Sequence, residues 1–332
     1  PLTALVPGLL LVGLLSAASY LLAGIPALAV MGPLVIALFV GLAWRAVAGL
    51  APASAPGASF SARTLLRVGI VLLGVRLDFA LLAQVGPAVL LGSLLVVTLG
   101  IFGIERLGKL AGLPPGLRLG IAVGTSICGA SAILAAVPAT RMKDEEAGLS
   151  VGIISVLGTL GVLGFAFFSS LLEPSDLVYG FLVGLTLHEV AQVLAAGYVP
   201  GTEAGDLATI VKLTRVALLA PALLVLSRLL GGSEAAGRRG LARLRAPVPL
   251  FLLGFLAVGV LNSLGWIPDP LGSLMLAGSL LLTTAAMVGL GLGLGLDLSV
   301  FRRVGSKALL VGSVGFLGLV AVMLPYAALV AR

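Results

Sequence analysis

The chain has 332 residues, of which 60% are hydrophobic and only 10% are charged. Soluble domains carry about 25% charged residues, so this composition excludes a soluble globular protein. The net charge of +7 does not indicate nucleic-acid binding, because the basic residues lie in short segments between apolar runs, as they do in membrane proteins. No nucleic-acid partner is therefore expected.

Apolar runs of about 20 residues, long enough to cross a bilayer, follow one another along nearly the whole chain. They predict an all-α polytopic membrane protein with about eleven transmembrane helices. The predicted spans are residues 4–22, 27–44, 62–77, 80–103, 116–138, 146–172, 177–199, 205–229, 248–264, 271–295 and 306–329.

We expect these spans to form a single transmembrane unit, residues 1–332, with a loop rich in Ala, Pro, Ser and Gly at Gly49–Ser61. The expected subdivisions are a first half that contains a repeat (62–172) with a broken helix at 116–138, polar core helices (177–229), a basic cytoplasmic linker (233–247), and C-terminal helices (248–329) with a second repeat hairpin (271–329).

The basic residues predict an orientation. With the N-terminus on one side of the membrane, the loops of that side hold 14 of the 20 lysines and arginines, the other side holds four, and Lys212 and Arg215 lie within a span. Cytoplasmic loops carry the excess of Lys and Arg. The N-terminus is therefore expected in the cytoplasm and the C-terminus outside, in the plasma (inner) membrane.

Two hairpin-like segments resemble each other. Leu73–Leu91 and Leu292–Leu310 are identical at 8 of 19 positions at an offset of 219 residues. In the predicted topology the first segment turns outside and the second inside, so the copies are inverted. Inverted repeats are typical of secondary transporters. Asp78 and Asp297 occupy matching positions at the turns, where we interpret them as helix caps.

A weaker resemblance relates residues 60 apart. Gly124 matches Gly184, and Leu134–Ala136 matches Leu194–Ala196. In the predicted topology these two spans run in the same direction, so they are not simple inverted partners. The sequence leaves open whether this resemblance is chance or whether the span count between them is wrong.

Small and polar residues begin the segment Gly124–Pro138, GTSICGASAILAAVP, in the middle of an apolar region. Its glycines allow a helix to open, and the freed N–H groups at the start of a half-helix favour an anion. The alternative is a seam of small residues for helix packing. The predicted substrate-binding residues here are Gly124, Thr125, Ser126, Cys128, Gly129 and Ser131.

Two further groups of polar residues lie within predicted spans, where ionisable side chains are costly and usually face a cavity or a partner. His188 and Glu189 are adjacent, and we expect them to carry coupling protons or ions. Gln192 follows on the same span and is expected to bind substrate. The alternative for His188, which is the only histidine, is a structural role.

Lys212 and Arg215 are three residues apart and therefore on one helical face. Two buried cations need anionic partners, for which Glu189, Asp206 and the substrate are candidates. We predict that both cations bind substrate; the alternative is an ion pair that fixes helix packing.

At these residues the chain resembles a known family. GTSICGASAILAAVPA, LHEVAQVLAAG and ATIVKLTRVALLAP resemble signature regions of the YeiH-type sulfate exporters, and LLRVGIVLLGVRLD resembles the third span of that family. The resemblance covers most of the chain and places it with bile-acid/sodium symporter-like and cation–proton antiporter-like carriers. It implies a panel domain, a core domain with crossed broken helices, and elevator-like alternating access. It also implies sulfate as the solute, whereas no second acidic sodium cluster is evident.

The expected function is secondary active transport of a small anion, sulfate or a related sulfur oxyanion, with proton coupling. The alternatives are a sodium- or proton-coupled organic-anion carrier, a channel, and an intramembrane enzyme that uses Cys128 and His188. We expect no enzymatic activity, no cofactor and no metal. The expected partners are a small anionic solute and the lipid bilayer, and a homodimer is expected by analogy alone.

Overall fold

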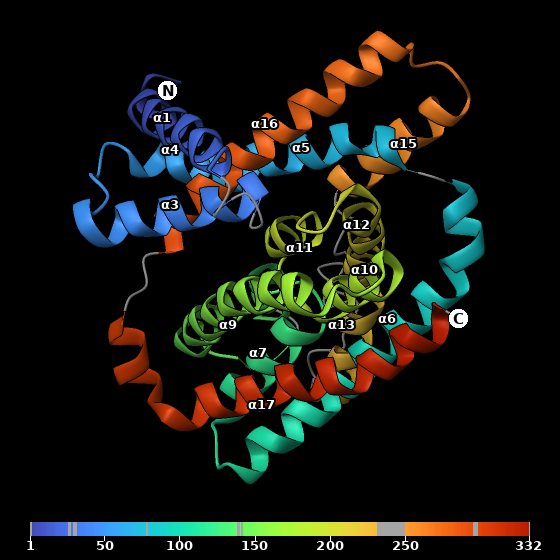
Figure 1. Cartoon of the computed structure of the whole chain (residues 1–332). Helices are drawn as coiled ribbons and strands as arrows, with labels where there is room; N and C mark the ends of the chain where they lie inside the picture. Colours follow the sequence, from blue (N-terminus) through green and yellow to red (C-terminus); the bar gives the residue numbers. More distant parts are fainter. Residues whose placement is uncertain are drawn as a thin grey trace.

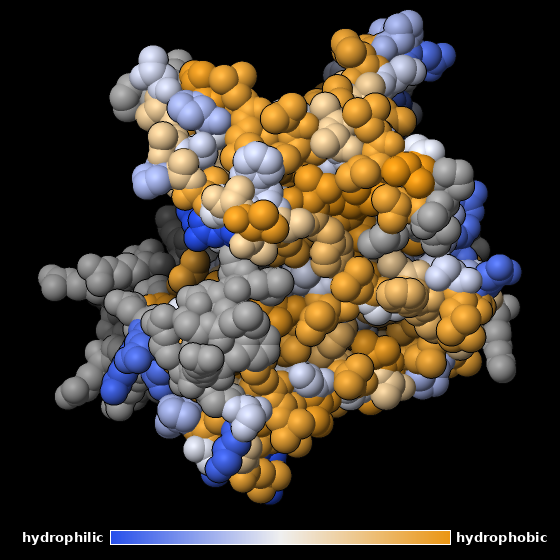
Figure 2. All heavy atoms as spheres, turned by 60° about the vertical axis from the view of Figure 1, so that its left-hand side comes forward, coloured by the Kyte–Doolittle hydropathy of each residue, from blue (hydrophilic) through white to orange (hydrophobic). Residues whose placement is uncertain are grey.

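The computed structural model describes residues 2–25, 28, 32–77, 79–137, 140, 142–230, 250–294 and 298–331, and every regular element in these ranges is a helix. Seven helices in the described ranges are long and apolar enough to cross a membrane. Large apolar side chains cover the outside, including Val47, which is 89% exposed, and Leu171, which is 79% exposed. Hydrophobic residues also dominate the face in Figure 2. An all-helical membrane protein is thereby supported, while the count of eleven spans stays a prediction.

The helices form two packing groups (Figure 1). Close backbone approach holds the first group together: a Cβ atom at Gly8 or Gly41 would collide with main-chain atoms of the neighbouring helix. Part of the loop expected at Gly49–Ser61 is in fact a short helix whose Ala58 is buried. The first helix group consists of α1 (Val6–Ala23), α3 (Gly32–Ala48), α4 (Ala55–Phe60), α5 (Leu66–Leu73), η3 (Gly74–Arg76), α15 (Leu250–Ser263) and α16 (Asp269–Leu294).

The second helix group surrounds a chain of short helices. Its main described contacts with the first group are those of α11 against α3 and α16. The basic linker expected at 233–247 lies outside the described residues. The group consists of α6 (Phe79–Leu110), α7 (Pro115–Ser126), α8 (Ala130–Ala136), α9 (Asp144–Leu172), α10 (Asp176–Thr186), α11 (Val190–Gly197), α12 (Thr202–Ala217), α13 (Leu219–Leu230) and α17 (Leu298–Val330).

The two segments related by 219 residues have matching places in the fold. The first leads from α5 to α6 and the second from α16 to α17, and each carries the chain from the first group to the second. α5 packs antiparallel to α16, with Gly69 beside Thr283, and the Tyr326 hydroxyl of α17 donates to the Ala88 carbonyl near the start of α6. Asp78 and Asp297, interpreted as caps, lie outside the described residues.

The segment predicted as the span 116–138 differs from the prediction, because it is a hairpin of two short helices. α7 ends at Ser126 and α8 begins at Ala130. A Cβ atom at Gly124 would lie 2.8 Å from the side chain of Ile133. A continuous helix would separate these two positions by about 13 Å. α8 therefore folds back along α7 instead of continuing across the molecule.

The segment predicted as the span 177–199 is a second hairpin. The Tyr179 hydroxyl, near the start of α10, donates to the Ala196 carbonyl, near the end of α11, at 2.9 Å. Gly197 also lies beside Val183. The beginning of α10 and the end of α11 are therefore neighbours, and the turn at residues 187–189 is the tip of the hairpin.

The two hairpins enter the molecule from opposite ends. α7 is parallel to α9, since Gly120 faces Ser150, whereas α9 and α10 are antiparallel, since Tyr179 bonds to Phe165 and Glu189 bonds to Ser155. α7, α8 and α9 correspond to α10, α11 and the α12–α13 segment at the offset of 60 residues. The weak resemblance thus relates two units of opposite direction, because a hairpin replaces a crossing in each.

Cysteine accessibility tests this topology. Cys128 is the only cysteine, so single cysteines can be placed in a Cys128→Ser background at the exposed positions Lys109, Lys143, Ser175 and Glu203. Two hairpins predict that cysteines at 109 and 143 react with a membrane-impermeant maleimide from one side, and those at 175 and 203 from the other. Two continuous spans would instead pair 109 with 175 and 143 with 203, which would contradict the hairpins.

Candidate functional site

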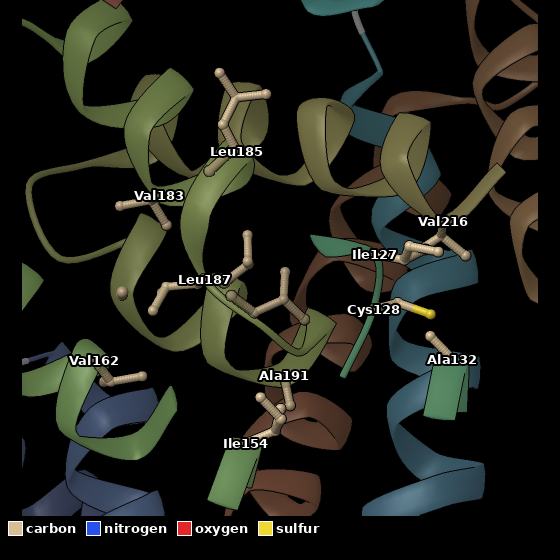
Figure 3. Close-up of a cluster of buried hydrophobic side chains, with 14 of the residues drawn as sticks. Ile127, Cys128, Ala132, Ile154, Val162, Val183, Leu185, Leu187, Ala191 and Val216 are labelled. Carbon is tan, nitrogen blue, oxygen red and sulfur yellow. The ribbon is translucent and has the colours of Figure 1, made fainter. Parts of the chain in front are cut away.

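The tips of the two hairpins meet in the interior of the second helix group. The first tip is Ile127–Gly129, and the second is Leu187–Glu189. A Cβ atom at Gly129 would lie 2.5 Å from the Cγ atom of Glu189. Figure 3 shows apolar side chains of both tips and of the helices around them. The tips are therefore enclosed by hydrophobic packing, where water does not satisfy main-chain groups.

Lys212 bonds to the carbonyl groups that the two breaks leave without helical partners. Its Nζ atom donates to Ile127 O at 2.9 Å, to Leu187 O at 2.8 Å and to His188 O. The side chain is completely buried. An ammonium group has three N–H donors, so all the donors of Lys212 are used by main-chain carbonyls of both tips.

Arg215 supports the same two helix ends one turn further along α12. Its guanidinium donates to Thr125 O and Ser126 O at the end of α7, and to Gly184 O and Leu187 O at the end of α10, over 2.9–3.3 Å. Cations at helix C-termini are favourable because of the helix dipole. These four bonds leave a single N–H of the guanidinium for any other partner.

That both cations bind substrate stays a prediction, because their described partners are main-chain carbonyls. Neither forms a described salt bridge with an acidic side chain. Both neutralise the C-terminal ends of α7 and α10 instead, so the two hairpins depend on them structurally. The sequence separation of Lys212 and Arg215 correctly placed them on one helical face, but their main-chain partners have no signature in the sequence.

Glu189 lies at the N-terminal ends of α8 and α11, the helices that follow the two breaks. Its carboxylate accepts a hydrogen bond from the main-chain N–H of Ala130 at the start of α8. It also caps α11, accepting from the main-chain N–H of Gln192, and the Ser155 hydroxyl donates to it at 3.3 Å. One half-buried carboxylate therefore joins both hairpins where their dipoles are positive.

Gln192 is predicted to bind substrate and lies directly behind Glu189. Its Oε1 atom accepts from the main-chain N–H of Glu189 at 3.0 Å, while its buried Nε2 atom has no described partner. Gly158 of α9 faces this amide. The structure thus brings Gln192 to the tip and leaves both N–H donors of its amide unused.

The predicted residues of the first hairpin have different surroundings. Gly124 packs against Ile133, the buried Thr125 hydroxyl has no described partner, and the Ser126 hydroxyl donates to Ala122 O. Cys128 Sγ lies 3.1 Å from the Oγ atom of Ser131, which is exposed. Of these side chains, Ser131 is therefore the one open to the surroundings.

His188 is buried, and neither ring nitrogen has a described hydrogen-bond partner. Its ring packs against Phe316 of α17, with 4.9 Å between the ring centroids. The thiol of Cys128 pairs with Ser131 and not with this imidazole. The pairing that an enzyme based on Cys128 and His188 would need is therefore not formed.

Ser155 also belongs to the site, although its sequence pattern does not predict this. It lies on α9 in a predicted span that is otherwise strongly apolar, and its partner Glu189 is 34 residues away. Ser155 is one of several hydroxyl residues in this helix and has no distinguishing pattern, because such hydroxyls are usually satisfied by the preceding helical turn.

Known proteins resemble the chain over nearly its whole length. A family described as "Conserved hypothetical protein 698" matches residues 7–312. A UPF0324 membrane protein of Bacillus cereus is 39% identical over 91% of this chain and 88% of the relative. Another, of Pseudomonas aeruginosa, is 39% identical over 95% of this chain and 92% of the relative. The chain belongs to this membrane protein family. The resemblance to the YeiH type is thereby confirmed, and the family supports an integral membrane protein.

Substitution of Gly129 tests the contact between the tips. This residue has φ of 69° and ψ of −136°, a conformation that costs other residues about 1–3 kcal/mol, and an alanine Cβ would also collide with Glu189. We expect Gly129→Ala to lower the thermal unfolding midpoint of the purified protein clearly. Gly148→Ala is the matched control, since its Cβ would meet no atom within 4 Å; equal midpoints for the two variants would contradict the contact.

Replacement of Lys212 by methionine tests its structural role. The change leaves the buried carbonyls of Ile127 and His188 without their donor, whereas Leu187 O keeps its bond from Arg215. Each unsatisfied group costs about 1–3 kcal/mol. We expect Lys212→Met to lower the unfolding midpoint and the yield of monodisperse protein. Lys109→Met, at an exposed position, is expected to match the wild type. A Lys212→Met protein as stable as this control would refute the role.

Proposed function

We propose that the chain is a secondary active transporter that moves a small anion, sulfate or a related sulfur oxyanion, together with protons. The observation that carries the proposal is the carboxylate of Glu189, held between the N-terminal ends of two half-helices inside an apolar helix bundle. Half-helices whose N-termini point at an anion are a feature of transporter binding sites. Ionisable residues inside membrane helices mark solute and proton pathways.

In this proposal Glu189 occupies the place of the solute. The N–H groups that hold its carboxylate are the donors that an external oxyanion would use. Protonation of Glu189 removes the competing charge, so that the carboxyl group leaves and the anion enters. The unused Nε2 group of Gln192 belongs to the predicted site. The exposed Ser131 hydroxyl would join it by exchanging its hydrogen bond to Cys128 O for one to the anion. Binding of the anion is thus coupled to uptake of a proton.

Elevator-like movement is the proposed mode of access. The second helix group touches the first mainly through α11, which belongs to one of the hairpins. Sliding of α11 against α3 and α16 would therefore move both tips together relative to the first group. The antiparallel pairs α5–α16 and α6–α17, and the two opposed hairpins, agree with an inverted repeat, as expected for alternating access.

The proposed orientation has the N-terminus in the cytoplasm of the producing cell. Because the first hairpin folds back, the segment with Lys143 lies at the same end of the molecule as the segment with Lys109. The predicted cytoplasmic side thereby gains positive charge, as the positive-inside rule favours. The plasma (inner) membrane is the proposed location.

An organic-anion carrier is the second candidate. It is favoured by a specific observation, a largely apolar cavity between the two helix groups that includes Arg76. The alternative of an enzyme that uses Cys128 and His188 has no described pairing of these two side chains in its support.

Transport by proteoliposomes tests the proposal. Uptake of labelled sulfate, with ethanesulfonate and other anions as competitors, is measured with and without a pH gradient. We expect the gradient to accelerate uptake by the wild type several-fold. Glu189→Gln is expected to retain anion exchange and to lose the response to the gradient, because the glutamine amide does not take up or release a proton.

Glu145→Gln is the matched control, since Glu145 is exposed at the start of α9, and it should respond to the gradient like the wild type. An undiminished response of Glu189→Gln would refute proton coupling at this residue. Absence of transport for every anion in the panel would refute the function.

A further inference from the structure

The cavity that includes Arg76 lies between the two helix groups, away from the hairpin tips. Its volume is about 520 Å³. α3, α5 and α16 form one wall, and α11 with the chain that follows it forms the other. Ser273 and Thr202 are exposed at its margin. The cavity thus adjoins the surface between the helix group that would move and the group that would stay.

Among the described residues that line this cavity, Arg76 is the only charged one. Its Nε atom donates to Asp206 Oδ2 at 2.9 Å, and the Tyr198 hydroxyl donates to Asp206 Oδ1 at 2.6 Å. Asp206 does not line the large cavity; it lines a small neighbouring pocket that shares Arg76 and Tyr198. Arg76 therefore stands between the cavity and its own carboxylate partner.

The walls of the cavity restrict the kind of anion that fits. Leucines at positions 34, 73, 194, 276 and 280 make them mostly apolar. The hydroxyls of Ser279 and Thr283 already donate to main-chain carbonyls, so they are available to a ligand as acceptors only. Sulfate needs several donors around its oxygens, and this cavity does not offer them. An anionic group on an apolar body suits both Arg76 and the leucines.

We infer that this cavity binds an organic anion, a sulfonate or carboxylate with an apolar body, whose anionic group replaces Asp206 as the partner of Arg76. The inference rests on the second candidate function, the organic-anion carrier, and defines its solute class. Planar guanidinium groups suit sulfonate-like and carboxylate oxygens, which they bind with two parallel N–H donors. The ligand and Asp206 therefore compete for the guanidinium group of Arg76.

Such binding would also release a connection between the two helix groups. Of the two salt bridges described in the structure, Arg118–Glu105 lies within the second group, whereas Arg76–Asp206 joins the first group to the second. An anion that takes Arg76 away from Asp206 therefore removes the described ion pair across this boundary. Occupation of the cavity is in this way linked to movement of the second group.

Binding of hexanesulfonate to the full chain in lipid nanodiscs tests the inference by calorimetry, with sulfate as the comparison anion. We expect wild-type protein to bind hexanesulfonate and to bind sulfate at least tenfold more weakly. Asp206→Asn should bind hexanesulfonate several-fold more tightly, because Arg76 is freed. Arg76→Gln should bind it at least tenfold more weakly. Tyr198→Phe, a milder change, should shift affinity in the direction of Asp206→Asn.

A purely structural salt bridge makes the opposite prediction. Arg76→Gln and Asp206→Asn would then lower the unfolding midpoint equally and leave the affinity for hexanesulfonate unchanged, or weaken it alike, and either result would overturn the inference. If Asp206→Asn does not fold, Tyr198→Phe serves as the test in its place. An affinity of Tyr198→Phe for hexanesulfonate equal to that of the wild type would then overturn the inference. Sulfate binding as tight as hexanesulfonate would overturn the solute class. Binding is measured without transport, so failure of the transport assay leaves a positive result here intact, and the reverse also holds.

Discussion

The carbonyl groups at two helix breaks, buried where water does not reach them, are the constraint on which the rest of the structure depends. Lys212 and Arg215 satisfy these carbonyl groups with seven hydrogen bonds at the ends of α7 and α10. Hydrogen bonds to charged groups contribute about 1.5–3 kcal/mol each, and this offsets part of the desolvation of two buried cations. The same pair of side chains therefore makes the breaks possible and holds both hairpins to α12.

The helices that begin after the two breaks are stabilised by a charge of the opposite sign. The helices that start there, α8 and α11, direct positive dipoles toward the carboxylate of Glu189. Cations thus fix the C-terminal ends, whereas a single, half-buried anion joins the N-terminal ends. The cations are fully buried and their donors almost fully used. Glu189 is the member of this arrangement that protonation or an external anion can displace, and this asymmetry connects the architecture to the proposed transport.

Hydropathy predicted the helical segments well, because each apolar run coincides with described helices, and the glycines of GTSICGA correctly indicated a break. The direction of the chain after the break was not predictable in this way. A run of about 20 apolar residues has the same composition whether it crosses a bilayer or folds back halfway. The offset of 60 residues was the available signal, since it conflicted with two crossings. The pair Arg76–Asp206, 130 residues apart, and the main-chain partners of Lys212 left no trace in the sequence pattern.

The site depends on two hairpins that enter from opposite ends and meet at their tips. Distances between spin labels at positions 175 and 201, in a Cys128→Ser background in lipid, measure this most directly. These positions flank the second hairpin. Folding back predicts a distance well below the ~30 Å thickness of the hydrocarbon core. A distance of ~30 Å or more would mean that the segment crosses the membrane, and it would contradict the meeting of the tips and the role of Glu189.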